Sequence, residues 1–250
     1  MDLVAAGLEH SVDGAVATIT LNRPEVRNAQ HPAMWAGMVE VLQSLDDEVR
    51  VVVVRGAGGT FSAGLDLSLF DSFVDMTAGS DEEIVDTIDT FQLPFAMLAD
   101  PRFISIAVVD GYAIGAGFQL ALACDLRLVA DDAQFCMKEP ALGLVPDLVG
   151  TKPLVEAVGY ARALEICATA RMVPATEAAE VGIAQAVVPA DQLDKTLEAW
   201  VAGLTAHSVG AVRATKALLQ QAPARSLDEQ RLAERTAQVG RFRELAALMA

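Results

Sequence analysis

The chain contains short, largely apolar runs that are separated by segments with helical spacing. The runs are Val51 to Val54, Ile104 to Val109 and Leu126 to Ala130, and such runs are typical of strands that are buried on both faces. In Pro32 to Leu45 the apolar residues recur every three or four positions, which predicts one face of a helix. A second helix is predicted from Ile114 to Ala123. Buried strands joined by helices indicate an α/β core.

The first part of the chain predicts a β-hairpin. Two strand-like segments, Leu3 to Leu8 and Val16 to Leu21, flank the turn dipeptide Asp13-Gly14. Further along, the polar and acidic stretch 67–90 predicts a mobile loop, with a break at 78–80 and a possible helix cap at Asp81.

The pattern changes near Asp191, after which only helical spacing is found. We therefore expect two regions, an α/β core over residues 1–190 and a helical appendage over residues 191–250. In the appendage, Leu232, Val239, Phe242 and Leu245 form an apolar stripe.

Charge and composition narrow the classes of partner. The formal net charge of -16 opposes sequence-independent binding to a nucleic-acid backbone, so no nucleic-acid partner is expected. The longest apolar stretch, Ala113 to Cys124, is shorter than the roughly 20 residues of a membrane span, so no membrane partner is expected. Three cysteines without framework spacing, and no recognisable leader, favour a cytoplasmic protein.

Two glycine-rich turns follow two of the predicted strands, at residues 55–66 and 110–117. The second opens a helix, where free backbone N–H groups and the helix dipole favour negative charge. Two such donors facing one oxygen make an oxyanion hole, although each turn alone could be purely structural. Phe61 occupies the third glycine position of a dinucleotide fingerprint, and Leu65-Asp66 replaces the Lys-Ser/Thr of a phosphate loop, so neither alternative is favoured.

These turns, with other segments in order, resemble the signature of the crotonase superfamily, the enoyl-CoA hydratase/isomerase family. The matching segments are 23–29, 61–67, 111–125, 133–139, 142–146 and 178–189. The resemblance implies an α/β crotonase (ClpP-like) fold of repeated ββα units with a C-terminal helical trimerisation region. It also implies a homotrimer or a dimer of trimers, and an acyl-CoA thioester substrate.

The resemblance assigns catalytic roles residue by residue. The backbone N–H groups of Leu65 and Ala116 would form the oxyanion hole, and Glu139 would carry protons. Gln119 stands where the hydratases of the family have their first carboxylate, and an amide cannot accept a proton from water as a carboxylate does. A single glutamate favours enoyl-CoA isomerisation. Hydration, other enolate chemistry of the family, and a non-catalytic acyl-CoA binding module remain alternatives.

The resemblance also places the substrate. Coenzyme A would lie near Arg23, Arg27 and Ala29, and the acyl chain near Leu69, Phe70 and Phe73. Further substrate contacts are expected at Ala63, Asp66, Leu67 and Gly115. Asp66 is also expected to cap a short helix, and Asp147 is interpreted as the cap of a helix starting at Leu148, with a second acid as the alternative. No metal is implied, and no cofactor besides the coenzyme A of the substrate.

Overall fold

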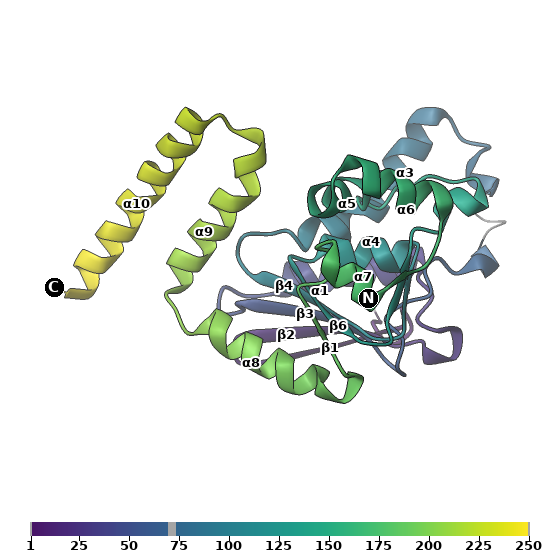
Figure 1. Ribbon diagram of the computed structural model, residues 1–250, viewed down its shortest axis with the longest axis horizontal. Coiled ribbons are helices and arrows are strands. Elements are labelled where there is room, and N and C mark those ends of the chain that lie inside the picture. The colour runs from purple at the N-terminus through teal and green to yellow at the C-terminus, as the bar shows by residue number, and fades with distance from the viewer. Residues whose placement is uncertain (1, 70–73, 250) are drawn as a thin grey trace.

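A six-stranded sheet lies at the centre of the computed structural model, which describes residues 2–69 and 74–249 (Figure 1). Its strands are β1 (Leu8–Asp13), β2 (Val16–Leu21), β3 (Val51–Gly56), β4 (Ile104–Val109), β6 (Leu126–Ala130) and β9 (Ala186–Val188). They are ordered β1-β2-β3-β4-β6-β9, and only the β1/β2 pair is antiparallel. The three apolar runs are therefore the strands β3, β4 and β6, as predicted from the sequence.

The N-terminal hairpin is confirmed, but its first strand was misplaced. Strand β1 begins at Leu8, where the predicted strand ended. The preceding residues form turns instead, because the Asp2 carboxylate accepts a hydrogen bond from the Ala5 N–H and the Gly7 N–H donates to the Val4 carbonyl. Gly7 has a φ of +72°, which ends this turn and leads into the strand.

Two ββα units give the chain its repeated pattern, β1-β2-α1 and β4-β5-α4. A second sheet, of order β5-β7-β8, lies beside the first. It consists of β5 (Tyr112–Ile114), β7 (Gln134–Cys136) and β8 (Val173–Pro174). The helices of this part of the chain are α1 (Pro32–Ser44), α3 (Asp81–Met97), α4 (Ala116–Ala123), α5 (Thr151–Val158), α6 (Tyr160–Thr169) and α7 (Ala175–Glu180). Because Ile114 ends β5, helix α4 starts two residues later than predicted.

Helix α3 occupies much of the segment that was predicted to be a loop. Its N-cap is Ser80, whose hydroxyl accepts from the Glu83 N–H while the Glu83 carboxylate accepts from the Ser80 N–H. This capping box stabilises a helix start, and it makes Asp81 the first helical residue rather than the cap. The acidic residues at the start of this helix hid its apolar face, which includes Phe91 and the buried Phe95.

Three helices, α8 (Leu193–Thr205), α9 (Val209–Gln221) and α10 (Leu227–Met249), follow the last strand. Helix α8 packs on strands of the central sheet, whereas α9 and α10 form a pair that projects from the body (Figure 1). The helical character predicted after Asp191 is confirmed. Within residues 2–69 and 74–249, no helix is long and apolar enough to cross a membrane.

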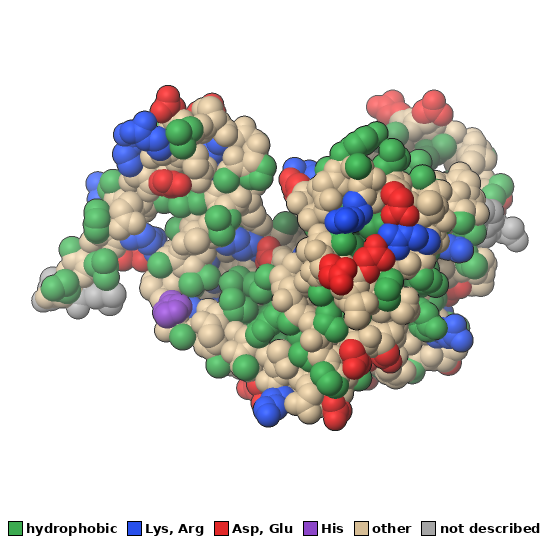
Figure 2. Space-filling view, viewed as in Figure 1, with side chains coloured by type: hydrophobic (Ala, Val, Ile, Leu, Met, Phe, Trp, Pro, Cys, Tyr) green, Lys and Arg blue, Asp and Glu red, His purple; other side chains and the backbone are tan. Residues whose placement is uncertain are grey.

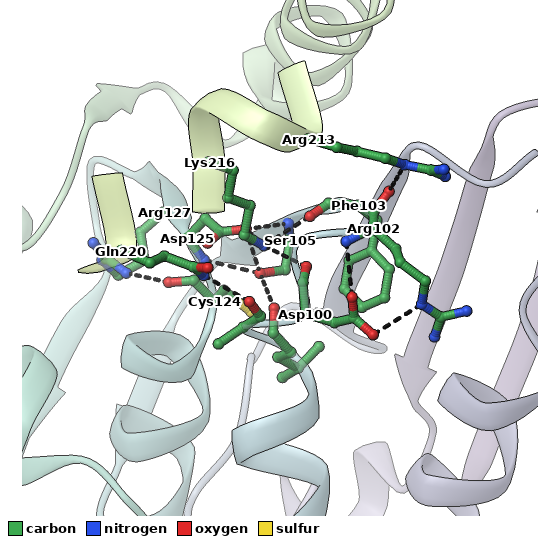
Figure 3. Close-up of polar contacts among 12 residues, drawn as sticks. Asp100, Arg102, Phe103, Ser105, Cys124, Asp125, Arg127, Arg213, Lys216 and Gln220 are labelled. Atoms are coloured by element: carbon green, nitrogen blue, oxygen red, sulfur yellow. Dashed lines mark hydrogen bonds and ion pairs between the residues drawn. The ribbon is translucent and has the colours of Figure 1, made fainter. Parts of the chain in front are cut away.

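Helix α9 is fastened to the core by polar side chains that cap backbone carbonyls (Figure 3). The Lys216 ammonium is only 8% exposed and donates to the carbonyls of Asp100 and Phe103 and to the Asp125 carboxylate, each at 2.7 Å. Asp125 also accepts from the N–H and the hydroxyl of Ser105 on β4. Arg213 donates to the carbonyls of Arg102 and Asp47. The first helix of the projecting pair is thus tied to the sheet and to the end of α4.

Candidate active site

A cavity of about 380 Å³ opens between the two glycine-rich turns and helices α1 and α3. Its wall is mostly apolar and includes Trp35 from α1 and Phe91 from α3. The site residues expected from the sequence that line it are Ala63, Leu65, Leu67, Gly115, Ala116 and Glu139. Other site residues expected from the sequence are described by the structure but are not part of this wall, namely Arg23, Arg27, Ala29, Asp66 and Gln119. Phe70 and Phe73 lie outside the described residues.

The two glycine-rich turns are held against each other at the cavity. Ser62 and Ala113 form a parallel bridge, in which Ser62 donates to the Tyr112 carbonyl and Ile114 donates to the Ser62 carbonyl. Gly64 has a φ of +93°, and a Cβ there would lie 2.5 Å from the Ile114 carbonyl oxygen. Only glycine allows this approach, which brings the backbone at Leu65 next to the start of α4.

Ala116 is the first residue of α4, so its N–H has no partner inside the helix. Among the described residues, no backbone carbonyl accepts a hydrogen bond from the N–H group of Leu65 or from that of Ala116. Both residues line the cavity. The arrangement offers two backbone donors, one of them at the positive end of a helix dipole, to an oxygen atom in the cavity.

Glu139 lies beside these donors as the first residue of the short 3-10 helix Glu139–Leu142. Its side chain is buried, and a Cβ on Gly115 would lie 3.1 Å from the Glu139 Oε1 atom. Oε1 accepts a hydrogen bond from Gln119, whereas Oε2 has no partner among the described residues. Burial raises the pKa of Glu139 above its usual value, and the negative charge of Asp147 adds to this effect. The carboxylate is therefore suited to exchanging a proton at Oε2.

Gln119, on α4, is fully buried and forms three hydrogen bonds. Its Nε2 donates to Glu139 Oε1 at 2.7 Å, and its Oε1 accepts from the N–H groups of Leu148 and Gly150 at 2.8 and 3.2 Å. Both ends of the amide are thus engaged by the protein.

Asp147 lines the same cavity as Glu139. Its interpretation as a helix cap is wrong, because no helix begins at Leu148: helix α5 starts at Thr151, and its N-cap is Gly150. Burial raises the pKa of the Asp147 carboxyl. The cavity therefore contains two carboxyl groups whose pKa values are both raised, which is an arrangement found at sites of proton transfer.

Asp66 is held away from the cavity by an ion pair. Its Oδ2 accepts from Arg23 at 2.9 Å, and Arg23 also donates to the Ala29 carbonyl. Its Oδ1 accepts from the Ser68 N–H and hydroxyl at the start of the 3-10 helix Leu67–Leu69, as expected of a cap. The hydrogen bond from Ser68 and the pairing with Arg23 lower the pKa of Asp66. Arg27, which is exposed and has a φ of +52°, lies at the end of the preceding turn.

The sequence did not reveal several residues of the cavity wall. Trp35, on α1, is 3% exposed and also faces the cavity. Ile88 lies in the segment 67–90 that was predicted to be a loop, and Phe91 is the residue directly after that segment. Their spacing to Ile84 and Phe95 is helical, and this spacing is the signal that could have identified them.

Comparisons with known proteins agree on one family. The model of the enoyl-CoA hydratase/isomerase family matches residues 11–246. The chain is 34% identical to the "Probable enoyl-CoA hydratase echA8" of Mycobacterium bovis, over 89% of this chain and 84% of that one. It is 32% identical to the peroxisomal Δ(3,5)-Δ(2,4)-dienoyl-CoA isomerase of Arabidopsis thaliana, over 85% and 80%.

A solved structure gives a further match. A Thermobifida fusca YX protein in complex with acetoacetyl-CoA, whose name places it among the enoyl-CoA hydratases, superimposes with a TM-score of 0.94. It is 48% identical to this chain, and the match covers 97% of each. The same name is carried by a structure in complex with CoA, which superimposes with a TM-score of 0.92.

Proposed function

Since this chain belongs to the enoyl-CoA hydratase/isomerase family and has the crotonase fold, we propose that it shifts a double bond of an acyl-CoA thioester by moving a proton. The observation that carries this proposal is the buried Glu139 carboxylate beside two free backbone donors. Enzymes of this family act on CoA thioesters. We propose that coenzyme A is part of the substrate and that no further cofactor takes part.

The thioester oxygen is placed between the N–H groups of Leu65 and Ala116. Removal of a proton from carbon 2 produces an enolate, whose charge resides largely on this oxygen. Two fixed donors at the start of α4 stabilise the developing charge, and their orientation is already set by the turn contacts at Gly64. The side chains of Leu65 and Ala116 have no chemical part in this step.

Glu139 transfers the proton. Its Oε2 atom takes the proton from carbon 2, and the C–H electron pair enters the enolate, which is conjugated with the 3,4 double bond. Return of the proton to carbon 4 leaves a 2,3 double bond, so a 3-enoyl-CoA becomes a 2-enoyl-CoA. No water is consumed. Burial raises the pKa of Glu139 above that of an ordinary glutamate, which makes its carboxylate a stronger base toward the proton on carbon 2.

Hydration is the alternative with less support, because it needs a water activated between two groups. Gln119 is an amide, and its oxygen already accepts from two N–H groups. A non-catalytic acyl-CoA binding module is the remaining alternative. A panel of acyl-CoA thioesters incubated in D₂O and followed by mass spectrometry separates the three: a hydratase adds the mass of water, an isomerase exchanges the proton at carbon 2 without adding water, and a binding module does neither.

A second candidate function is favoured by Asp147. The name of the Arabidopsis relative describes a conversion of 3,5-dienoyl-CoA to 2,4-dienoyl-CoA, in which a proton leaves carbon 2 and another arrives at carbon 6. A second carboxyl group in the cavity, with a raised pKa, can protonate the distant carbon. We therefore include a dienoyl-CoA among the substrates.

Asp147→Asn is expected to lower the conversion of a 3,5-dienoyl-CoA by about 100-fold, because the distant proton donor is lost. Exchange at carbon 2 should fall far less than the conversion, because the Glu139 carboxylate is retained, although loss of the Asp147 charge should lower the Glu139 pKa. Stopped-flow absorbance of the conjugated diene measures the conversion of the dienoyl-CoA, and mass spectrometry measures the exchange at carbon 2. The exposed Asp131→Asn is the matched control. Equal loss of both activities would contradict separate roles for the two carboxyl groups.

Coenzyme A is placed at the mouth of the cavity near Arg23, Arg27 and Ala29. Arg23 is already paired with Asp66, so it serves mainly to hold the turn that carries Leu65, whereas Arg27 is exposed and can reach a phosphate. A cytoplasmic location agrees with three free thiols.

We also propose that the protein assembles as a homotrimer or a dimer of trimers through its C-terminal helices. Several apolar residues of α10 are exposed, namely Leu232, Val239, Phe242 and Leu245, and Figure 2 shows apolar side chains along the projecting pair. Burying such a stripe contributes about 25 cal/mol for each Å².

Light scattering at micromolar concentration is expected to give three or six times the chain mass of 26.3 kDa. Phe242→Glu should weaken the assembly, since it places a charge in the stripe, whereas Glu234→Gln on the same helix should not. A wild-type monomer under these conditions would rule out the assembly.

A further inference from the structure

We infer that Gln119 is a positioning residue that holds Glu139 and the turn carrying Asp147 in one fixed arrangement, so that the two carboxyl groups work on the same substrate. The inference rests on the proposed function and extends it. It gives Gln119 a role that differs from binding or activating a water molecule.

The orientation of the Gln119 amide is fixed by its neighbours. Two of its three partners are the backbone N–H groups of Leu148 and Gly150, which can only donate. The amide oxygen must therefore face them, and the NH₂ group must face Glu139. As a consequence Glu139 Oε1 is an acceptor in either protonation state, and Oε2 is the atom left to gain and lose the proton.

The turn that Gln119 holds has a strained backbone. Val149 has a φ of +67°, in the left-handed region that β-branched residues avoid. This conformation points the N–H groups of the residues on either side of it at one oxygen atom. Gly150 leaves room for the glutamine, since a Cβ there would lie 2.5 Å from Gln119 Cγ. Strained backbone persists where its surroundings fix it, and Gln119 provides two of the fixing hydrogen bonds.

A second glutamine holds the same turn from the other side. Gln92, on α3, donates from Nε2 to the Asp147 carbonyl at 2.6 Å. Gln92 has no hydrogen bond to Glu139 among the described residues. Substituting each glutamine separately therefore distinguishes the effect of a loosened turn from the effect of a lost hydrogen bond to Glu139.

Loss of the Gln119 side-chain amide should alter Glu139 in a definite direction. The hydrogen bond from Gln119 opposes the rise in the Glu139 pKa that burial and Asp147 cause. The other titratable groups near Glu139 are the thiols of Cys136 and Cys167 and the adjacent Lys138. None of these can replace a neutral N–H donor at Oε1, so the Glu139 pKa should rise further.

The test compares Gln119→Met with Gln92→Met in two assays: deuterium exchange at carbon 2 as a function of pH, and conversion of a 3,5-dienoyl-CoA. For Gln119→Met we expect the acid limb of the exchange profile to move up by about one pH unit. We also expect dienoyl conversion to fall about 10- to 100-fold, with KM changed by less than about threefold. For Gln92→Met we expect the lower dienoyl conversion without the pH shift.

Several outcomes decide the matter. An unchanged pH profile and an unchanged ratio of the two activities in Gln119→Met would overturn the inference, even if that variant is less stable, because a merely structural glutamine would move neither. If Gln119→Met does not fold, Gln119→Asn gives the same test with an amide too short to reach both partners. No exchange by the wild-type protein on any acyl-CoA would instead contradict the proposed function, which the inference needs.

Discussion

Replacing Glu139 with glutamine is expected to lower isomerisation of a 3-enoyl-CoA, and exchange at carbon 2, by about 10²- to 10⁴-fold. The substitution removes the group that carries the proton and leaves the Leu65 and Ala116 donors in place. The new side chain is close in shape, and its oxygen can still accept the hydrogen bond from Gln119. The fold and the affinity for CoA should therefore change little. Turnover by mass spectrometry and CoA binding by calorimetry measure the two effects separately.

The pH dependence of the wild-type reaction tests the same role. Glu139 must be ionised to take the proton, so kcat/KM should rise with pH through the Glu139 pKa. Since burial raises this pKa, the rise should lie above the pH range of an ordinary glutamate. Glu156→Gln is the control, because Glu156 is half exposed and its ion-pair partner among the described residues is Lys152 on the same helix. Full activity of Glu139→Gln would show that the proton is carried by another group.

The sequence predicted an element correctly where the local pattern of apolar residues matches the burial of that element in the fold. Val51 to Val54 and Ile104 to Val109 are buried between layers of the molecule, so a continuous apolar run and a strand coincide there. The hairpin turn was recognised, but the strand Leu8–Asp13 contains mostly exposed polar residues. Its position is set by pairing with β2, which is a contact that no local pattern shows.

Helix α3 shows how composition can mislead. Its first turn holds Asp81, Glu82 and Glu83, which suggested a solvated loop. These carboxylates are instead favourable at the start of a helix, because they face the positive end of its dipole. The apolar face of this helix supplies part of the cavity wall, so the error in the fold also concealed that part of the wall.

Asp147 shows a different reason why part of the site could not be predicted from the sequence. An aspartate just before a segment that was expected to be helical resembles a cap, and caps are common. The turn that carries Asp147 has a left-handed backbone at Val149, and the N–H groups of Leu148 and Gly150 donate to Gln119, which lies 28 positions before Asp147. Interactions of this kind appear only when the chain is folded, and the partners of Gln119 could not be predicted for the same reason.

Loss of the Lys216 ammonium should have a large effect on stability. Its ammonium has three N–H groups, and each has an acceptor: two backbone carbonyls and the Asp125 carboxylate. It also lies 5.5 Å from the centre of the Phe103 ring. Asp125 follows directly after α4, so the lysine joins the C-terminal helices to the element that carries Ala116 and Gln119 (Figure 3).

Lys216→Met is expected to lower the free energy of unfolding by about 2–4 kcal/mol, because two carbonyls lose the ammonium as donor and the Asp125 carboxylate loses its ion pair, keeping only the hydrogen bonds from Ser105. This expected loss is smaller than the loss for a fully buried ion pair, because the Asp125 side chain is 22% exposed to solvent. For a chain of this size the melting temperature should fall by roughly 5–15 °C. Lys152→Met is the matched control: Lys152 is 77% exposed, and its pair with Glu156 should contribute less than about 1 kcal/mol. Calorimetry at one fixed protein concentration measures both variants, because assembly alters the apparent stability. Equal small effects of the two substitutions would show that α9 is held to the core by apolar packing and not by its lysine.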